Sequence, residues 1–481
     1  MKKTIIFLLV SFIVLLSSAQ HKKTYDNILE ELLSNSALKN ASLGIYAENL
    51  NTGKVVFNHN SQASLVPASV FKILPTSIAL EMFGPDHQFK TELAYSGSIS
   101  TDGTLNGDLY IIGYGDPCLG SSNFSYHYGD LISDWVNKIK AEGIKKINGD
   151  IIADASYFDR INIPDTWIWE DLANYYGNPG SSLNYKDNLY YIHFKTGNTD
   201  GSPTTITKIE PDDLNLNIDN RVTSSSTTWD ESFIFYGEGK NDRTIRGTLP
   251  WKKSDFSIKG SIPDPELYIC KVLNGALNTA GISVSGENKR TFDIVDTPRK
   301  VFHTVLSPKL LTIAETTNLK SFNLYAEMLS FHISKEAGKP YKDAVLSHLT
   351  SKGVNTDGLN IEDACGLSHF NSITAYQMTQ WLKYMRQKST YGDEFFSTLP
   401  VAGTSGTLSR YCIGTKAQNR LHAKSGSMTR VRAYGGYILN SDGDEIVFCF
   451  ISNNYSCNNY GMRKMFENFF IQIAEISEKS E

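Results

Sequence analysis

The sequence predicts an α+β protein in which an antiparallel sheet flanked by helices is interrupted by a large, mainly β insertion. Strand-like alternation of apolar residues occurs near both ends, at residues 42–57 and 421–453, and helical periodicity lies between them at residues 324–385. Residues 88–296 instead form short apolar runs broken by Gly, Asn and Asp. A chain of 481 residues is long enough for roughly three domains.

The N-terminal residues have the pattern of a secretory signal peptide. Lysines precede an apolar run at residues 5–16, and Ser17, Ser18 and Ala19 supply small residues before the expected cleavage site. The run is shorter than the ~18 apolar residues of a spanning helix, and no later segment reaches that length. We therefore expect residues 1–19 to be removed and the product to be periplasmic, soluble or loosely membrane-associated, with no stable membrane span.

The elements of the outer part follow in order. After a short helix at residues 26–33, an Asn-Thr-Gly turn predicts a hairpin at residues 41–60. The stretch Pro-Ala-Ser-Val-Phe-Lys-Ile-Leu at residues 67–74 is expected to begin a buried helix. Further helices are expected at residues 324–335 and 374–385, followed by the C-terminal strands and an amphipathic helix that packs on the sheet.

Within the insertion, two segments repeat the order helix, Gly-Ile, strand. They begin near residues 131 and 267, and they suggest one β-rich domain whose halves flank a further insertion rich in Asn, Asp, Ser and Thr. The expected division is an outer domain at residues 20–87 plus 299–481, an inserted domain II at 88–158 plus 240–298, and an inserted domain III at 159–239.

Composition excludes several classes of function. The net charge of -5 and the absence of dense Lys/Arg runs argue against a nucleic-acid partner. The ten histidines are scattered without an H-E-x-x-H pattern, so we expect no metal and no cofactor. The six cysteines form no C-x-x-C pair, and an exported chain leaves both disulfides and free buried thiols open.

Ser69 and Lys72 are the first candidates for chemistry. Three residues apart at the start of a helix, they lie on the same side, where a lysine can take the proton of a serine hydroxyl if its pKa is lowered by burial or by a second cation. The alternative is an ordinary capped helix that carries a lysine. The chain contains a decoy pair of the same spacing, Ser36 and Lys39.

Two later motifs would complete an active site. Ser-Phe-Asn at residues 321–323 lies just before a helix, and Lys-Ser-Gly-Ser at residues 424–427 begins a strand of the terminal hairpin. Decoys of both, at residues 182–184 and 195–197, lie close together inside the insertion, where the second runs directly into a turn. The later pair therefore has the better context.

The three motifs in this order resemble the Ser-x-x-Lys, Ser-x-Asn and Lys-[Thr/Ser]-Gly patterns of penicillin-binding proteins and serine β-lactamases. The long separation of the first two resembles the D-alanyl-D-alanine carboxypeptidase/endopeptidase family, also called penicillin-binding protein 4 or peptidase family S13. That family carries a two-domain insertion at this place in a transpeptidase-like domain. Further stretches similar to the family lie at residues 107–117, 149–158, 167–177, 366–368 and 399–403.

The resemblance implies a role for each matching residue. Ser69 attacks the carbonyl between two D-alanines of a peptidoglycan stem peptide or crosslink, with Lys72 as its base. Ser321 and Lys424 relay the proton to the departing D-alanine, and Asn323 hydrogen-bonds the substrate backbone. β-Lactam antibiotics are the implied covalent inhibitors.

The resemblance also implies a substrate-binding edge at residues 424–427. Lys424 and Ser425 hold the terminal carboxylate, Gly426 follows in the same strand, and the N–H groups of Ser69 and Ser427 form the oxyanion hole.

One departure bears on specificity. The family's Asp-Gly-Ser-Gly-Leu-Ser-Arg reads Asp-Ala-Cys-Gly-Leu-Ser-His at residues 363–369, so His369 replaces an arginine that in relatives binds the third residue of the peptide. Asp154 and Phe158 match two further positions of that binding site. We hypothesise that Arg430 compensates. An Arg430→Ala variant with unchanged preference for a diaminopimelate-bearing peptide would refute this.

Two rival functions were weighed. A serine β-lactamase would share Ser69 and Lys72, but the chain has no Glu-x-x-Leu-Asn, and Ser321 stands where class C enzymes carry a tyrosine. A catalytically silent wall-binding scaffold would have no need of Ser69, Lys72, Ser321, Asn323 and Lys424 together. An α/β-hydrolase is disfavoured because the chain has no Gly-x-Ser-x-Gly.

Overall fold

A computed structural model describes residues 24–159, 163–178, 180–237 and 239–478. The expected signal peptide at residues 1–19 lies outside these residues. Within them, no helix is both long enough and apolar enough to cross a bilayer.

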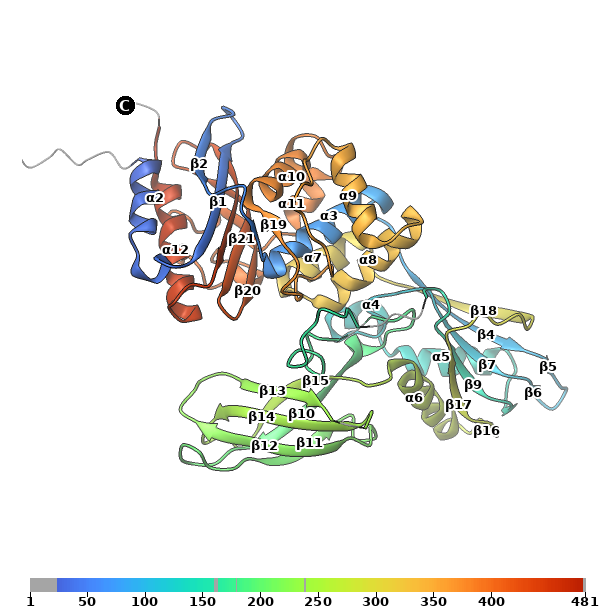
Figure 1. Ribbon diagram of the computed structural model, residues 1–481. Coiled ribbons are helices and arrows are strands. Elements are labelled where there is room, and N and C mark those ends of the chain that lie inside the picture. The colour runs from blue at the N-terminus through green and yellow to red at the C-terminus, as the bar shows by residue number, and fades with distance from the viewer. Residues whose placement is uncertain (1–23, 160–162, 179, 238, 479–481) are drawn as a thin grey trace, which may run out of the picture.

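One five-stranded antiparallel sheet combines strands from both ends of the chain (Figure 1). β1 pairs with β22 along its whole length, from Ser42 opposite Asn453 to Asn49 opposite Ile446. The expected assembly of one sheet from both ends is thus confirmed. In spatial order the strands are β2 (Val55–His59), β1 (Ser42–Asn49), β22 (Glu445–Asn453), β21 (Val431–Leu439) and β20 (Leu421–Met428).

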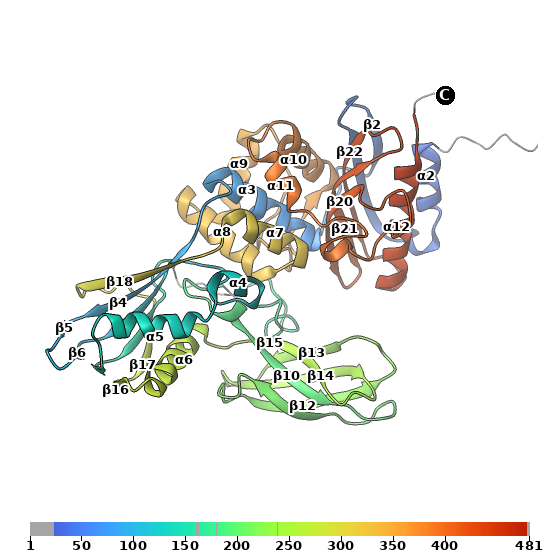
Figure 2. The same ribbon diagram turned by 180° about the vertical axis from the view of Figure 1, so that it is seen from behind.

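Helices cover both faces of this sheet. α2 (Tyr25–Leu33) and α12 (Asn459–Glu475) pack side by side on the outer face, as the view from behind shows (Figure 2). Phe466, Phe469 and Phe470 of α12 are buried against the sheet, as expected from the amphipathic pattern. The opposite face carries a helical layer made of α3 (Ile73–Phe83), α7 (Leu310–Lys320), α8 (Asn323–Ala337), α9 (Tyr341–Ser351), α10 (Ala375–Gln387) and α11 (Gly392–Ser397).

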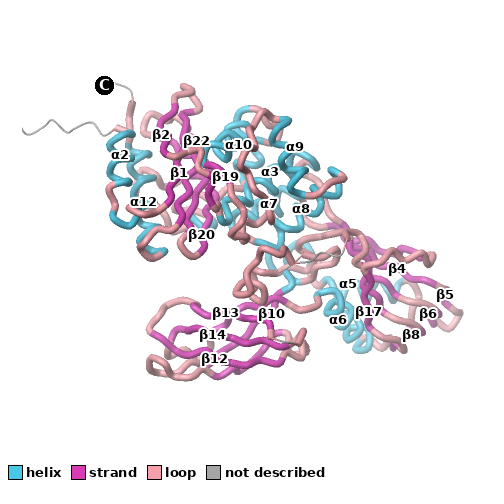
Figure 3. The backbone as a smooth tube through the Cα atoms, viewed as in Figure 1, coloured by secondary structure: helices cyan, strands magenta, loops and turns pink. Residues whose placement is uncertain are grey.

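The insertion between α3 and α7 forms two further groups of strands, separate from the main sheet in the tube view (Figure 3). One group has a five-stranded sheet, β17-β9-β7-β4-β18, and a smaller sheet, β16-β8-β6-β5. Its helices are α4 (Ser125–Tyr128), α5 (Leu131–Ala141) and α6 (Pro265–Thr279). Its strands are β4 (Lys90–Ser96), β5 (Ser98–Ile99), β6 (Thr104–Asn106), β7 (Leu109–Gly113), β8 (Lys146–Asn148), β9 (Ile151–Asp154), β16 (Ser283–Val284), β17 (Asn288–Thr291) and β18 (Arg299–Leu306).

The repeated order seen in the sequence corresponds to a structural repeat in this group. α5 leads into β8 and β9, and α6 leads into β16 and β17. The equivalent strands lie side by side, because β16 pairs in parallel with β8 and β17 pairs in parallel with β9.

The second group consists of two three-stranded sheets, β11-β10-β15 and β12-β14-β13, around a shared apolar core. Its strands are β10 (Leu189–Lys195), β11 (Thr205–Glu210), β12 (Asn217–Ser225), β13 (Glu231–Tyr236), β14 (Asp242–Pro250) and β15 (Phe256–Ser261). Short remaining elements are β3 (Ser64–Leu65), β19 (Ile373–Thr374) and the 3₁₀ turns η1 (Ser36–Leu38), η2 (Ala68–Lys72), η3 (Ser122–Phe124), η4 (Lys186–Asn188) and η5 (Gly406–Leu408).

The sheet pairing does not follow the expected domain boundaries after residues 239 and 298. β14 and β15 lie beyond the first boundary but pair with β13 and β10, and β18 lies beyond the second but pairs with β4 of the insertion. Backbone hydrogen bonds between distant segments decide this grouping, and a local change in composition cannot show them.

Candidate active site

Ser69 and Lys72 lie in η2, where the main sheet meets the helical layer. The turn is a 3₁₀ helix and not the expected α-helix, which begins only at Ile73. Side chains three residues apart eclipse one another in a 3₁₀ helix. Accordingly, Nζ of Lys72 lies 3.0 Å from Oγ of Ser69. The decoy pair, Ser36 and Lys39, is exposed at η1.

Two further oxygens surround the Lys72 amine. Its Nζ donates to Oδ1 of Asn323 at 2.6 Å and to the carbonyl of Cys365 at 2.7 Å. Lys72 is fully buried, and this burial lowers its pKa below the ordinary value, although Cys365, Asp363 and Glu327 oppose the shift. Burial therefore favours the neutral amine, the form that acts as a base.

A second lysine and serine lie opposite. Nζ of Lys424, on β20, donates to Oγ of Ser321 at 2.9 Å and to the carbonyl of Ser425 at 2.7 Å. Ser321 occupies the left-handed C-cap of α7 (φ 57°), and the chain there turns into α8. Burial, followed by the charge of Lys72, lowers the pKa of Lys424 well below its ordinary range.

Asn323 is the first residue of α8 and has both ends of its amide engaged. Its Oδ1 accepts from Lys72, and its Nδ2 donates to the carbonyl of Tyr176 at 2.8 Å. This differs from the expected contact of Asn323 with the substrate backbone alone, because the amide also orients the base.

β20 forms the wall facing the serine. A Cβ on Gly426 would lie 2.5 Å from the carbonyl oxygen of Pro67 and 3.0 Å from the amide nitrogen of Ser69, so only glycine fits at this distance. Oγ of Ser425 donates to Oγ1 of Thr407 at 2.8 Å. Ser427 is exposed beyond this contact.

A cavity of about 930 Å³ opens over these groups. It extends from the serine to the inserted sheet β11-β10-β15, so both parts of the molecule line it. Its lining includes Ser69, Ser321, Asn323, Ser427 and His369 on one side, and Tyr175, Tyr191 and Lys259 on the insertion side.

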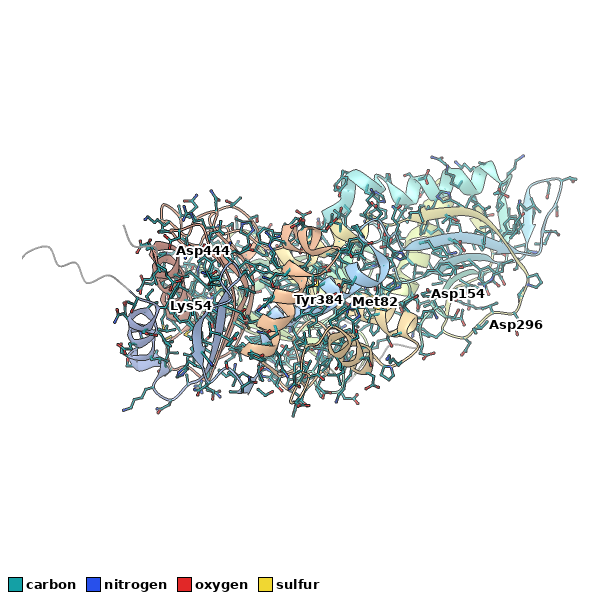
Figure 4. All side chains as sticks on the ribbon, turned by 90° about the horizontal axis from the view of Figure 1, so that it is seen from above. Lys54, Met82, Asp154, Asp296, Tyr384 and Asp444 are labelled. Atoms are coloured by element: carbon teal, nitrogen blue, oxygen red, sulfur yellow. The ribbon has the colours of Figure 1, made fainter. Side chains whose placement is uncertain are left out.

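The structure does not bring the other specificity candidates into this cavity. The buried Asp154 carboxylate pairs with Arg299 of β18 at 2.5 Å, and Figure 4 shows Asp154 in the inserted sheet, well apart from Lys54 and Asp444 of the main sheet. Phe158 packs on His332 with ring centroids 4.9 Å apart. Both residues therefore serve packing within the insertion here. Arg430 is exposed in the turn between β20 and β21, and its role stays a prediction.

A buried group behind Lys72 is absent from the residues singled out in the sequence. Glu327, Asp363 and Cys365 bring three potential ligand atoms within 4.8 Å of one another. The carboxylates already accept N–H donors, however: Glu327 from Cys365 at 2.7 Å, and Asp363 from Gly366 at 2.7 Å and from Ser368 at 2.6 Å. We therefore interpret the group as a support for the loop. The only local signal was the position of Glu327 four residues after Asn323, on the same helix face.

An α+β domain with a serine–lysine pair on a helix, facing a strand that carries a second lysine, is the architecture of penicillin-interacting serine enzymes. The profile of the D-Ala-D-Ala carboxypeptidase 3 (S13) family matches residues 26–468. The chain belongs to this family and is a serine-type D-Ala-D-Ala carboxypeptidase.

Individual relatives agree with this assignment. The chain is 29% identical to a D-alanyl-D-alanine carboxypeptidase of Actinomadura sp. (strain R39), over 89% of this chain and 80% of that protein. It is 25% identical to the D-alanyl-D-alanine carboxypeptidase DacB of Haemophilus influenzae, over 92% and 91% of the two chains. The fold is similar to the crystal structure of penicillin binding protein 4 from H. influenzae, with a TM-score of 0.78, 24% identity and coverage of 92% and 97%. That protein has also been crystallised with a β-lactam, in a structure that matches with a TM-score of 0.73, 22% identity and coverage of 93% and 97%.

The six cysteines have free thiols, and five of them are buried. Of the two possibilities left open by the sequence, the structure therefore has the free thiols.

Proposed function

We propose that Ser69 forms an acyl-enzyme when this carboxypeptidase acts on D-Ala-D-Ala stem peptides and, as a DD-endopeptidase, on peptidoglycan crosslinks. The environment of Lys72 carries the proposal. Asn323 Oδ1 and the Cys365 carbonyl can only accept hydrogen bonds, so they take the two N–H bonds of a neutral amine. The remaining lone pair then faces Oγ of Ser69 at 3.0 Å, as a general base requires.

The proton balance of acylation follows from the two serine–lysine pairs. Lys72 takes the proton of the Ser69 hydroxyl while Oγ bonds to the carbonyl carbon, and the N–H groups of Ser69 and Ser427 stabilise the oxyanion. When the C–N bond breaks, Lys424 supplies a proton through Ser321 to the departing D-alanine amine. Water then hydrolyses the ester.

The edge of β20 is suited to the terminal carboxylate of the peptide. The Lys424 amine lies beside Ser425, whose hydroxyl is presented at the cavity side of the strand. A cation with an adjacent hydroxyl is a favourable partner for a carboxylate. The retained hydroxyl at Ser425 should make serine equivalent to the family's commoner threonine.

The size of the cavity supports the endopeptidase activity. A cavity of about 930 Å³ that reaches Tyr191 and Lys259 of the insertion leaves room beyond a single D-Ala-D-Ala end. We infer that a second, crosslinked peptide occupies this extension. Penicillins are proposed as covalent inhibitors at Ser69, and the β-lactam complex of the H. influenzae relative supports this.

Export completes the proposed function. The apolar run at residues 5–16 with its small flanking residues supports a cleaved leader and a periplasmic product acting in cell-wall biogenesis. Oxidising surroundings are compatible with the free thiols, because burial raises the pKa of Cys118, Cys365 and Cys449 and keeps them unreactive.

Release of D-alanine tests this proposal. The mature protein is incubated with a peptide ending in D-Ala-D-Ala and, separately, with a crosslinked peptide dimer, beside the Ser69→Ala variant and the decoy control Ser36→Ala. We expect both reactions to be lost in Ser69→Ala alone. Equal turnover by Ser69→Ala and the wild type would refute the role of Ser69, and cleavage of the linear peptide alone would refute the endopeptidase activity.

A further inference from the structure

The base Lys72 depends on a carbonyl whose direction is fixed from behind. The Cys365 carbonyl that accepts from Lys72 at 2.7 Å belongs to the peptide joining Cys365 to Gly366. The N–H of that same peptide donates to Oδ1 of Asp363 at 2.7 Å. Because a trans peptide is planar, holding its N–H on one side directs its carbonyl to the other, toward the amine.

The preceding peptide is held by Glu327. Oε1 of Glu327 accepts from the N–H of Cys365 at 2.7 Å and from the N–H of Ala364 at 3.0 Å. Glu327 is buried on α8, one turn after Asn323, which itself accepts from Lys72. One helix therefore contacts the base twice, directly through Asn323 and indirectly through Glu327 and the Cys365 peptide.

We propose that Glu327 is a positioning residue for the acylation of Ser69: its carboxylate holds the Ala364–Cys365 backbone so that the Cys365 carbonyl takes one N–H of neutral Lys72 and leaves the lone pair for the serine. With that carbonyl displaced, the amine would have one fixed acceptor in Asn323 and could turn an N–H toward Ser69 instead. The inference rests on the proposed role of Ser69 and Lys72.

The buried charge of Glu327 also acts on the base. Burial, and next the charge of Asp363, raise the pKa of Glu327 to about 7. Its negative form favours the ammonium form of Lys72 and opposes the effect of burial on that lysine. The other groups facing this pair are Cys365 on the same loop, Tyr341 on α9 and Lys424 on β20.

Two substitutions separate holding from charge. Glu327→Gln keeps an acceptor oxygen and removes the charge, so we expect penicillin acylation to stay within about 10-fold of the wild type. Without the negative neighbour, Lys72 loses its proton at lower pH, and the rise of the acylation rate with pH should move to lower pH. Glu327→Leu removes the acceptor, and we expect acylation to fall by about 100-fold, as for a misplaced catalytic group.

The measurement is the second-order rate of acylation by a fluorescent penicillin across pH, with Glu336→Gln as the matched control, an exposed glutamate on the same helix. A Gln profile that coincides with the wild type, or moves to higher pH, would overturn the proposal. So would a folded Gln variant that does not acylate, because the charge itself would then be indispensable. If Glu327→Leu does not fold, the Gln profile decides alone. Continued acylation of Ser69→Ala would instead refute the proposed function.

Discussion

Each lysine of the site is buried beside a serine, and this arrangement costs stability while it serves chemistry. Lys72 and Lys424 are both fully buried, and neither forms an ion pair with a carboxylate within the described part of the chain. An unpaired buried amine favours its neutral form. The protein therefore exchanges folding free energy for two bases that are free of protons near neutral pH.

Replacing Lys424 with methionine should expose this exchange. Its pKa in the folded protein lies below the ordinary value, so the unfolded chain binds the extra proton, and this lysine's contribution to the free energy of unfolding rises with pH between the two values. Lys424→Met should release no D-alanine, yet be more stable by about 1 kcal/mol near neutral pH. The gain should disappear by about pH 10.

Thermal denaturation across pH checks this prediction, with the exposed Lys39→Met as control. A Lys424→Met variant that is less stable than the wild type at neutral pH would show that the buried amine is stabilising.

The residues of the site divide by the kind of signal that each one leaves in the sequence. Ser69 and Lys72 could be predicted because their contact is local, three residues apart. Cys365 could not, because its carbonyl meets Lys72 only in the folded chain, and a backbone contact leaves no trace in residue type. Asp154 and Phe158 matched family stretches, but their neighbours Arg299 and His332 come from distant segments and draw them into packing.

At the scale of elements, the site depends on how closely β20 approaches η2. The 3₁₀ form of η2 aligns Ser69 with Lys72, and the glycine at position 426 lets the strand pass against the backbone of Pro67. Helical periodicity predicted a helix at residues 67–74 but did not distinguish a 3₁₀ turn from an α-helix, since both place i and i+3 on one side.

Gly426→Ala tests this approach. The added Cβ would lie 2.5 Å from the Pro67 carbonyl oxygen, so the strand must move away, which should cost about 2 kcal/mol and slow acylation. Gly275→Ala in α6 is the matched control, because nothing lies within 4 Å of its added Cβ and alanine favours a helix. Thermal melting and penicillin acylation provide the readouts, and a Gly426→Ala variant that matches Gly275→Ala in both would contradict the close packing.

At the scale of the whole molecule, the insertion is fastened to the helix that carries Asn323. Asp187, in a run of three residues with positive φ, accepts from the Tyr325 hydroxyl of α8 at 2.6 Å and from Ser121 at 2.8 Å. The strand content of the insertion could be predicted from its texture. Its boundaries could not, because β14, β15 and β18 choose partners far away in the sequence.

Tyr325→Phe should loosen this connection. It removes a hydrogen bond to the buried Asp187 carboxylate, whose pKa burial already raises, and we expect a loss of about 1–3 kcal/mol. Tyr126→Phe, at a tyrosine that is 75% exposed, serves as control. If the two variants melt at the same temperature, Asp187 does not fasten the insertion.

The most direct test of the central claim is to locate the penicillin adduct by mass spectrometry. The account predicts one long-lived adduct on the peptide that contains Ser69, absent in Ser69→Ala and present in Ser36→Ala. An adduct on another residue, or none on folded wild-type protein, would contradict the assignment of the nucleophile. Rapid hydrolysis of the penicillin would instead support the β-lactamase alternative.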